Sequence, residues 1–356
     1  MREEWLNRIA LTWANKTRLR GIRQALDRCG SATEVVRLHP DLVTPEAMLF
    51  ASKELEFIEK HQIKTYFYKD EDYPYRLAQC VDAPLLLYAK GHADVNPKHV
   101  VSVVGTRMPS ERGKDWCRRF VLDLAAKVPD VTIVSGLAYG IDVIAHKAAM
   151  EAGISTIIIP AHGLDRIYPS VHRSVAVQAL DNGGILTEYT RGTEPERFNF
   201  VARNRIVAGM ADAVVVVESK KKGGSLITAD MAVDYGRDVF AVPGRVDDVC
   251  SVGCNDLIKR NKAQLIDCAD DLIAAMQWQE EGKKPVQTCM VEMMCDLTEN
   301  QQRLLQMLRE AEDGLHINQL VMETQLAYNI VSSELVMMEL QDVVKSMPGG
   351  MWRVKK

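Results

Sequence analysis

Cysteine pairs that bind zinc or build a disulfide framework are missing from this 356-residue chain. It has eight cysteines, but none belongs to a C-x-x-C pair, and the nearest two are Cys250 and Cys254. That spacing favours neither a zinc site nor a disulfide framework. The irregular spacing of His146, His162 and His172 favours packing or hydrogen bonding over a metal cluster. We therefore expect reduced, mostly packed thiols and no metal or other cofactor.

Long apolar runs and an excess of positive charge are missing as well. No run reaches about 18 apolar residues, and the first twenty residues carry charges and two tryptophans where a signal peptide has an apolar core. We expect a cytoplasmic protein without membrane contact. The formal net charge is −4, whereas proteins that coat nucleic acid are commonly basic throughout. Any phosphate binding must therefore be local.

Two common phosphate-binding fingerprints are also absent. There is no G-x-G-x-x-G, and the apolar run that starts at Val131 ends in Ser135-Gly136, where a nicotinamide enzyme carries an acid for the ribose hydroxyls. A Walker A cradle is excluded because Lys114 is followed by Asp115. Ser135 lacks the flanking glycines of a nucleophile elbow. These absences argue against a dehydrogenase, a P-loop motor and a serine hydrolase.

What the chain does have, from about Val100 onward, is an alternation of short β-branched runs with helix-length amphipathic stretches. The runs are VVSVVG, VTIVSG, STIIIP, GILTE, AVVVVE and DVFAVPG, with stretches at 111–128, 140–152, 170–181, 198–210 and 225–236 between them. This pattern is typical of an α/β fold with a parallel sheet. Because the runs are continuous rather than alternating, helices should cover both faces of the sheet. We expect a Rossmann-like domain over 69–278.

Smaller domains are expected on either side. Residues 1–68 show helical spacing with a break at Gly30 and a cap at Ser31, which predicts a small helical domain of SAM-like or helix-hairpin-helix-like type. The polar stretch 279–296 is expected to be a linker. Over 297–356, three helical patterns followed by a hairpin pattern predict a winged helix; its helices are expected at 299–310, 316–323 and 328–341.

The last of these helices has an unusual charge pattern for a DNA-reading element. It contains Glu334 and Glu339, is followed by Asp342, and has no lysine or arginine. A helix that reads duplex DNA is normally basic. We therefore favour a protein-contact or auxiliary role for the winged helix.

Two strand ends resemble phosphate-binding loops, Gly105-Thr106-Arg107 and Ser135-Gly136. In each, a strand delivers glycine and free backbone N–H groups to the start of a helix, where anions are favoured. Arg107 adds a guanidinium that can bind phosphate in a bidentate manner. The alternative is that the glycines only permit tight turns between strand and helix.

The stretch 200–244 is the most informative part of the sequence. It places Arg203 and Arg205, three lysines and two glycine turns around two strands of buried type, at positions where an α/β sheet opens its ligand crevice. The lysines, Lys220, Lys221 and Lys222, can equally belong to an ordinary solvated face.

The central region resembles the bacterial DNA-processing protein A (DprA/Smf) family. The resemblance rests on VVGTR at 103–107, SGLAYGIDVIAH at 135–146, GLDRIYP at 163–169, TE at 187–188, RNRIVAG at 203–209, GGSLITADMA at 223–232, GRDVFAVPG at 236–244 and SVGCNDLI at 251–258. It implies a single-stranded DNA-binding protein that protects incoming strands and loads a RecA-type recombinase in transformation or recombination, without catalysis. It also implies a homodimer formed through the Rossmann-like domain.

The resemblance further implies which residues contact DNA. Phosphate contacts are expected at the two strand ends, a base is expected to stack on Phe200, and Arg197, Arg203 and Arg205 are the expected cations around it. The full expected set is Gly105, Thr106, Arg107, Ser135, Gly136, Arg197, Phe200, Arg203, Arg205, Lys220, Lys221 and Lys222. One of Arg203 and Arg205 is expected to be structural, paired with Glu188 or Glu218, and the other to face DNA.

The chain departs from the family pattern at a few positions. Tyr139 and Ser170 stand where relatives are often basic, and Val201 replaces a proline.

The alternative function is a nucleotide-cleaving phosphoribohydrolase of the lysine-decarboxylase-like Rossmann class, suggested by Gly223-Gly224. The catalytic pattern of those enzymes is broken here, because Asp230 stands at the glutamate position. Asp142, Asp165 and Glu188 are expected to be turn or pairing residues rather than catalytic acids.

Overall fold

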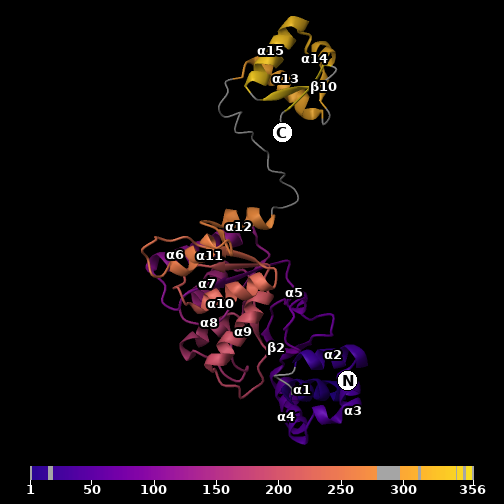
Figure 1. Ribbon diagram of the computed structural model, residues 1–356, viewed down its shortest axis with the longest axis vertical. Coiled ribbons are helices and arrows are strands. Elements are labelled where there is room, and N and C mark those ends of the chain that lie inside the picture. The colour runs from indigo at the N-terminus through magenta and orange to yellow at the C-terminus, as the bar shows by residue number, and fades with distance from the viewer. Residues whose placement is uncertain are drawn as a thin grey trace. The chain divides into compact units, whose positions relative to one another are not determined.

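The chain forms two compact units, residues 1–278 and 279–356. The computed structural model describes residues 2–14, 19–278, 297–311, 314–341, 343–347 and 350–354. The linker predicted over 279–296 lies outside these residues. Figure 1 shows the ribbon of both units.

The first unit is built on a sheet that has nine strands among the described residues, in the order β1-β2-β6-β5-β4-β3-β7-β8-β9. All neighbours from β6 to β9 are parallel, whereas β1 and β2 pair antiparallel with each other and β2 pairs antiparallel with β6. This confirms the predicted parallel α/β sheet. The strands are β1 (Lys64–Phe67), β2 (Leu86–Gly91), β3 (His99–Val104), β4 (Val131–Ser135), β5 (Thr156–Ile158), β6 (Gly184–Thr187), β7 (Ala213–Val216), β8 (Asp238–Ala241) and β9 (Gln264–Leu265).

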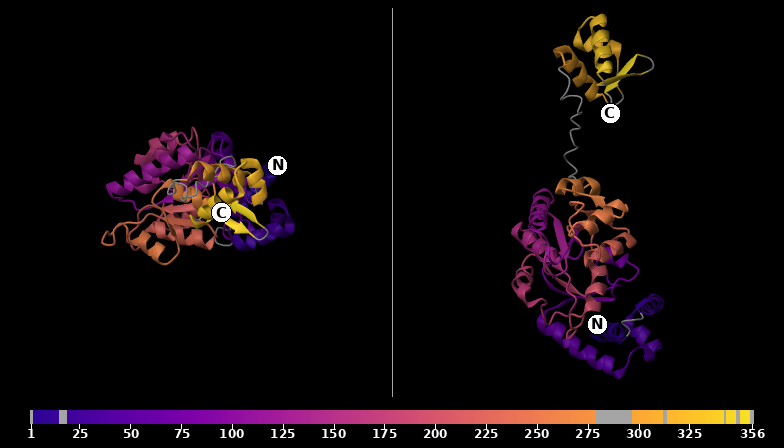
Figure 2. Two further views of the ribbon diagram at one scale, coloured as in Figure 1. Left: turned by 90° about the horizontal axis from the view of Figure 1, so that it is seen from above. Right: turned by 60° about the vertical axis from the view of Figure 1, so that its left-hand side comes forward.

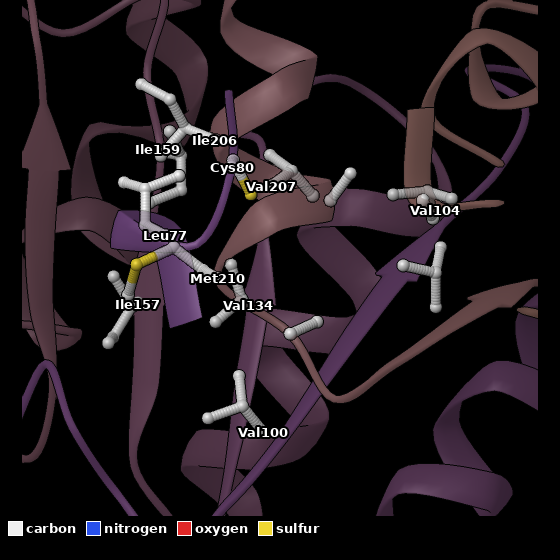
Figure 3. Packing of buried hydrophobic residues seen from close by; sticks show 14 of the residues in the cluster. Leu77, Cys80, Val100, Val104, Val134, Ile157, Ile159, Ile206, Val207 and Met210 are labelled. Atoms are coloured by element: carbon white, nitrogen blue, oxygen red, sulfur yellow. The ribbon is translucent and has the colours of Figure 1, made fainter. Parts of the chain in front are cut away.

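Helices cover both faces of this sheet, as the continuous apolar runs predict. Val100 and Val104 of β3 point to the face covered by α5 (Tyr75–Ala78), α9 (Arg197–Gly209), α10 (Gly224–Asp234) and α11 (Val252–Lys259). Val101 and Val103 point to the face covered by α6 (Glu111–Lys127), α7 (Ile141–Glu151) and α12 (Ala269–Met276). A short 3-10 turn η2 (Ser170–His172) and α8 (Arg173–Gln178) complete the unit. Figure 3 shows the first of these two cores, where Ile206, Val207 and Met210 lie among strand residues.

The N-terminal helices pack on the antiparallel edge of the sheet. These are α1 (Arg2–Ala14), α2 (Leu19–Cys29), α3 (Ala32–Leu38), the 3-10 turn η1 (Pro40–Leu42) and α4 (Pro45–His61), which gather at one end of the unit in Figure 1. Ile9, Leu26 and Leu55 share a core with Phe67 of β1 and Leu86 of β2. Residues 64–67 were predicted to belong to the helical domain, but they form β1 and extend the central sheet. Among the described residues, no helix combines the length and apolarity needed to span a bilayer.

The second unit is a three-helix domain with a small sheet. Its helices are α13 (Glu299–Glu310), α14 (Ile317–Thr324) and α15 (Tyr328–Leu340), and its strands are β10 (Leu315–His316), β11 (Val344–Met347) and β12 (Met351–Val354), in the order β10-β12-β11. The hairpin of β11 and β12 is visible as the pair of arrows beside the helices in Figure 2. Leu304, Leu320 and Leu335 meet in one core with Trp352 of the hairpin. These elements confirm the predicted winged helix and add strand β10.

Candidate nucleic-acid interface

A crevice opens where the strand order reverses at the carboxyl edge of the sheet. The helices that follow the adjacent strands β3 and β7 lie on opposite faces of the sheet, so the chain leaves these two strands in opposite directions. An open α/β sheet is expected to bind its ligand at such a position. The crevice has a volume of about 600 Å³. The predicted residues that line it are Gly105, Thr106, Arg107, Gly136, Arg197, Phe200, Arg203, Lys220 and Lys222. Ser135, Arg205 and Lys221 are not among the lining residues.

The loop after β3 forms a fixed floor for the crevice. The backbone N–H of Thr106 donates to the carbonyl of Glu218 at 2.8 Å, and the N–H of Ile141 donates to the carbonyl of Thr106 at 3.3 Å. Gly140 has φ +80°, and a Cβ atom there would overlap the Thr106 carbonyl and come within 2.9 Å of the Arg107 Cα. The glycine therefore lets the loop close against the start of α7, which fixes the direction of Arg107.

Arg107 and two aromatic rings form the outer wall of the crevice. The Arg107 guanidinium carbon lies 5.5 Å from the centre of the Phe200 ring, within cation–π range. The Tyr168 ring lies 5.9 Å from the Phe200 ring, centre to centre. Arg107 is exposed, and within the part of the chain described here it makes no hydrogen bond or ion pair. Its donors are free for an anion, and the neighbouring ring is held in place beside them.

Arg203 lies beneath the crevice and is 5% exposed. Its guanidinium donates to the Ile159 carbonyl, while its buried Nε has no hydrogen-bond partner. Across Gly136 lies Asp142, whose carboxylate accepts the N–H of Ala138 at 3.3 Å. Burial raises the pKa of Asp142, and the positive charge of Arg203 opposes this rise. Arg203 thus places a buried guanidinium under the crevice, close to the Asp142 carboxylate.

Arg205 faces away from the crevice, although it is only two residues from Arg203. It forms an ion pair with Glu188 and also donates to the carbonyl of Asp82. Arg205 is therefore the structural arginine that pairs with Glu188, whereas Arg203 is buried and bonded to a carbonyl, so its contact with DNA stays a prediction. The expected pairing and turn roles of Glu188, Asp142 and Asp165 are also present, since Asp165 accepts the N–H of Gly192 at 3.1 Å.

Ser135 does not reach the crevice. It is fully buried, and its hydroxyl donates to the carbonyl of Val103 at 2.6 Å. Its role in this position is to tie β4 to β3. Only the backbone turn at Gly136, and not the Ser135 side chain, borders the space where a ligand can lie.

The opposite wall of the crevice is formed by the loop after β7 and by the first turn of α10. Lys220 and Lys222 line the crevice, Lys221 is exposed beside them, and none of the three forms an ion pair with a described residue. Gly223 is the N-cap of α10, and no side chain of the N-cap accepts a hydrogen bond from the first N–H groups of the helix.

The charge balance of the crevice is strongly positive. Its lining contains five cationic side chains, Arg107, Arg197, Arg203, Lys220 and Lys222, and one carboxylate, Asp142. The start of α10 adds the positive end of a helix dipole. The weakly acidic chain therefore concentrates positive charge at this crevice, as local phosphate binding requires.

The predicted histidines serve as hydrogen-bonding residues. His146 is fully buried between the Gly136 carbonyl, at 2.6 Å, and the hydroxyl of Thr156, at 2.7 Å, and burial lowers its pKa to about 4. His162 bonds to Gly163 and Tyr168, and His172 bonds to the Leu137 carbonyl. The neutral His146 ring fixes the turn at Gly136 from behind.

Metal-ligating atoms come together elsewhere in the described residues, in Asp267, Cys268 and Asp271 at the start of α12. The Asp271 carboxylate accepts the N–H of Asp267 at 2.9 Å, which is a local helix-end contact. None of these residues lines the crevice. Asp230, the residue at the glutamate position of the alternative enzyme class, binds Lys262 at 2.6 Å and does not line the crevice either.

Two features of the site were not predicted. Tyr168 supports the Phe200 ring, although the sequence offered only its place in the quoted motif GLDRIYP. Glu54 of α4 is 1% exposed and accepts the N–H of Arg191 at 3.1 Å, and it also pairs with the Arg191 guanidinium. Burial raises the pKa of Glu54. The N-terminal helices thus hold the loop that leads into α9.

Comparison with known proteins places the chain in a family. Residues 64–277 match the family model described as DNA recombination-mediator protein A, and residues 294–350 match the DprA winged helix domain. The chain belongs to the DprA/Smf family.

Relatives within the DprA/Smf family cover most of the chain. Protein Smf of Synechocystis is 34% identical over 83% of this chain and 81% of its own length, and DNA processing protein DprA of Streptococcus pneumoniae is 40% identical over 59% and 73%. The X-ray structure of the S. pneumoniae DprA matches with a TM-score of 0.64 at 32% identity, over 74% of this chain and 95% of that one. A structure of DNA processing protein A from Helicobacter pylori, described by its single-stranded DNA binding mode, matches with a TM-score of 0.55 at 30% identity, over 61% and 96%.

Proposed function

We propose that this protein binds single-stranded DNA in the crevice at the carboxyl edge of its sheet, without sequence preference. The observation that carries the proposal is the exposed Arg107 guanidinium, which lies beside the Phe200 ring in a crevice lined by five cations and one carboxylate. An unpaired cation next to an aromatic ring suits a strand whose phosphates and bases alternate. The single-stranded DNA binding mode described for the H. pylori relative supports the same ligand.

Each wall of the crevice has a separate task in this proposal. Arg107, Lys220 and Lys222 bind phosphates, together with the N–H groups at the start of α10. Phe200 stacks against a base, which every base permits because each has a π-face. Arg203 acts from below as a buried charge. Since none of these contacts depends on the hydrogen-bonding edge of a base, the strand is bound irrespective of sequence.

Membership of the family supports a wider proposal. The protein protects incoming single strands and loads a RecA-type recombinase in transformation or recombination, as a cytoplasmic homodimer formed through the Rossmann-like domain. It performs no reaction on the strand. The state of three residues supports a binding role: the Ser135 hydroxyl is buried, the His146 ring is held on both nitrogens, and Asp230 is paired with Lys262.

Salt-dependent binding of oligo-dT tests the DNA site. Fluorescence anisotropy at several salt concentrations should show tight binding at low salt, and Arg107→Ala should weaken it. Loss of one phosphate contact should also reduce the slope of log K against log salt by about 0.7, as expected for single strands. Lys98→Ala is the matched control, because Lys98 is an exposed cation just before β3, at the opposite edge of the sheet.

Two results would contradict the proposal. One is an absence of oligo-dT binding by the unchanged protein at low salt. The other is an Arg107→Ala protein whose affinity and salt slope match those of Lys98→Ala, since the crevice would then not be where the strand is bound.

A further inference from the structure

Tyr139 presents an open aromatic ring beside the crevice. It follows Gly136 and Ala138, which line the crevice, and it directly precedes Gly140, the N-cap of α7. Tyr139 is 52% exposed, and its hydroxyl makes no hydrogen bond with any residue that the structure describes. A large ring without a polar partner can bind a ligand that offers a flat surface, such as a base.

A second, buried ring holds Tyr139 in place. The Tyr139 and His172 rings lie 4.9 Å apart, centre to centre, at an angle of 61°, which is an edge-to-face arrangement. His172 is 8% exposed, and its Nδ1 donates to the Leu137 carbonyl at 2.9 Å. Tyr168, which supports the Phe200 ring, lies four residues before His172, so one short segment backs both rings. Tyr139 is thus restrained from one side, and the rest of its ring is open to a ligand.

Phe200 and Tyr139 reach Arg107 from different sides of the sheet. Phe200 lies in α9, Tyr139 stands two residues before α7, and these helices cover opposite faces of the sheet. The Arg107 guanidinium carbon is 5.5 Å from the centre of the Phe200 ring. A Cβ atom on Gly140, the residue after Tyr139, would come within 2.9 Å of the Arg107 Cα, so the turn that carries Tyr139 packs against the Arg107 backbone. Arg107 therefore stands between the helix that carries Phe200 and the turn that carries Tyr139.

Given the strand-binding function proposed above, on which this inference rests, we propose that Tyr139 is a second base-stacking residue of the site. Every internal phosphate of a strand has a base on either side of it along the chain. With a phosphate on Arg107, the base on one side stacks on Phe200 and the base on the other side stacks on Tyr139. The contact uses the π-face of the base, so it keeps binding independent of sequence. Because stacking on Tyr139 releases no counterions, it adds affinity without adding to the salt dependence.

Two strands of equal length and charge test this role. One is oligo-dT, and the other is an abasic strand that keeps the sugars and phosphates but has no bases. Fluorescence anisotropy on the full chain should show that Tyr139→Ala weakens oligo-dT binding by about 5- to 150-fold, as expected for the loss of one stacked base, with an unchanged salt slope. At low salt, the abasic strand should bind equally to Tyr139→Ala and to the unchanged protein. Tyr139→Phe keeps the ring and should bind oligo-dT as the unchanged protein does.

Tyr75→Ala is the matched control. Tyr75 is a tyrosine of similar exposure, 49%, at the start of α5. It lies near the amino end of β3, at the opposite edge of the sheet from the crevice, because the adjacent Arg76 donates to the carbonyls of Pro97 and Lys98. This variant should leave the binding of both strands unchanged. Equal affinity of Tyr139→Ala and the unchanged protein for the abasic strand shows in addition that the fold and the phosphate contacts of the Tyr139→Ala variant are intact.

Three results would refute the stacking role. In the first, Tyr139→Ala binds oligo-dT as tightly as Tyr75→Ala does. In the second, Tyr139→Ala weakens binding of the abasic strand as much as binding of oligo-dT, so the residue does not act on a base. In the third, Tyr139→Phe loses as much affinity as Tyr139→Ala, so the hydroxyl and not the ring makes the contact. In all three cases a weakening of both strands by Arg107→Ala keeps the DNA site itself in place, whereas failure of the unchanged protein to bind oligo-dT refutes the proposed function and this inference with it.

Discussion

Gly136→Ala is expected to damage both the stability of the first unit and the proposed DNA site. The Cβ atom would lie 2.5 Å from Nη1 of Arg203, with the Asp142 carboxylate as close on its other side. Ordinary contact needs about 3.5 Å, so each group must retreat by about 1 Å. Both side chains are buried. Retreat of Arg203 also breaks its hydrogen bond to the Ile159 carbonyl.

The magnitude follows from these two losses. Overpacking of a buried position costs about 1–3 kcal/mol, and the loss of a hydrogen bond from a charged donor adds about 1.5–3 kcal/mol at most. We expect a fall of about 2–5 kcal/mol in the free energy of unfolding, or roughly 4–15 °C in Tm for a unit of this size. Differential scanning calorimetry on the full chain measures this shift.

A second glycine provides the control. Gly21 lies within α2, and nothing lies within 4 Å of a Cβ atom added there. Gly21→Ala should stabilise the helix by about 0.8–1 kcal/mol. If Gly136→Ala unfolded within about 1 °C of the unchanged protein, the close approach of Arg203 and Asp142 across this turn would be refuted.

Three further predictions concern the stacking surface, the buried histidine and the structural arginine. Phe200→Ala should weaken oligo-dT binding by about 1–3 kcal/mol per stacked base with an unchanged salt slope, as measured by anisotropy. The pKa of His146 is lowered from 6.5 to about 4, so the stability that its neutral ring contributes is complete above pH 6.5 and is lost as the pH falls toward 4. Unfolding curves from pH 7 to 4 should therefore show a fall of up to about 3 kcal/mol in the free energy of unfolding. In the His146→Gln protein this fall should be absent. Arg205→Ala should destabilise the fold by about 2–4 kcal/mol because it removes the guanidinium that pairs with the half-buried Glu188, and Glu188→Gln in the same protein should recover part of this loss in denaturant titrations.

The parallel part of the sheet was predictable because its signal is local. Runs such as VVSVVG and AVVVVE are apolar on both faces, and each is followed by a helix-length stretch. Strands β1 and β2 were not predicted, because their signal is not local. The segment 64–67 is short and begins with Lys64, and its strand character depends on pairing with residues 86–89, which are 19 to 25 positions away.

The candidate site was predicted at the level of motifs rather than of individual side chains. Arg203 and Arg205 are two residues apart on a helix, so their side chains point to different sides. The sequence could therefore predict different roles, but the assignment depends on Glu188, which arrives from β6. Ser135 illustrates the same limit. Its motif marked the correct strand end, but the register of β4 against β3 directs its hydroxyl to Val103 instead of the crevice.

The contact between Glu54 and Arg191 has a consequence for the evolution and engineering of this chain. A protein shortened to residues 64–356 would keep every residue that lines the crevice. Yet the segment that leads into α9 would lose its buried carboxylate partner, Glu54. The positions of Arg197 and Phe200 in the first turn of α9 would then be less restrained. The N-terminal helices thus act as a brace for a crevice to whose lining they contribute no residue.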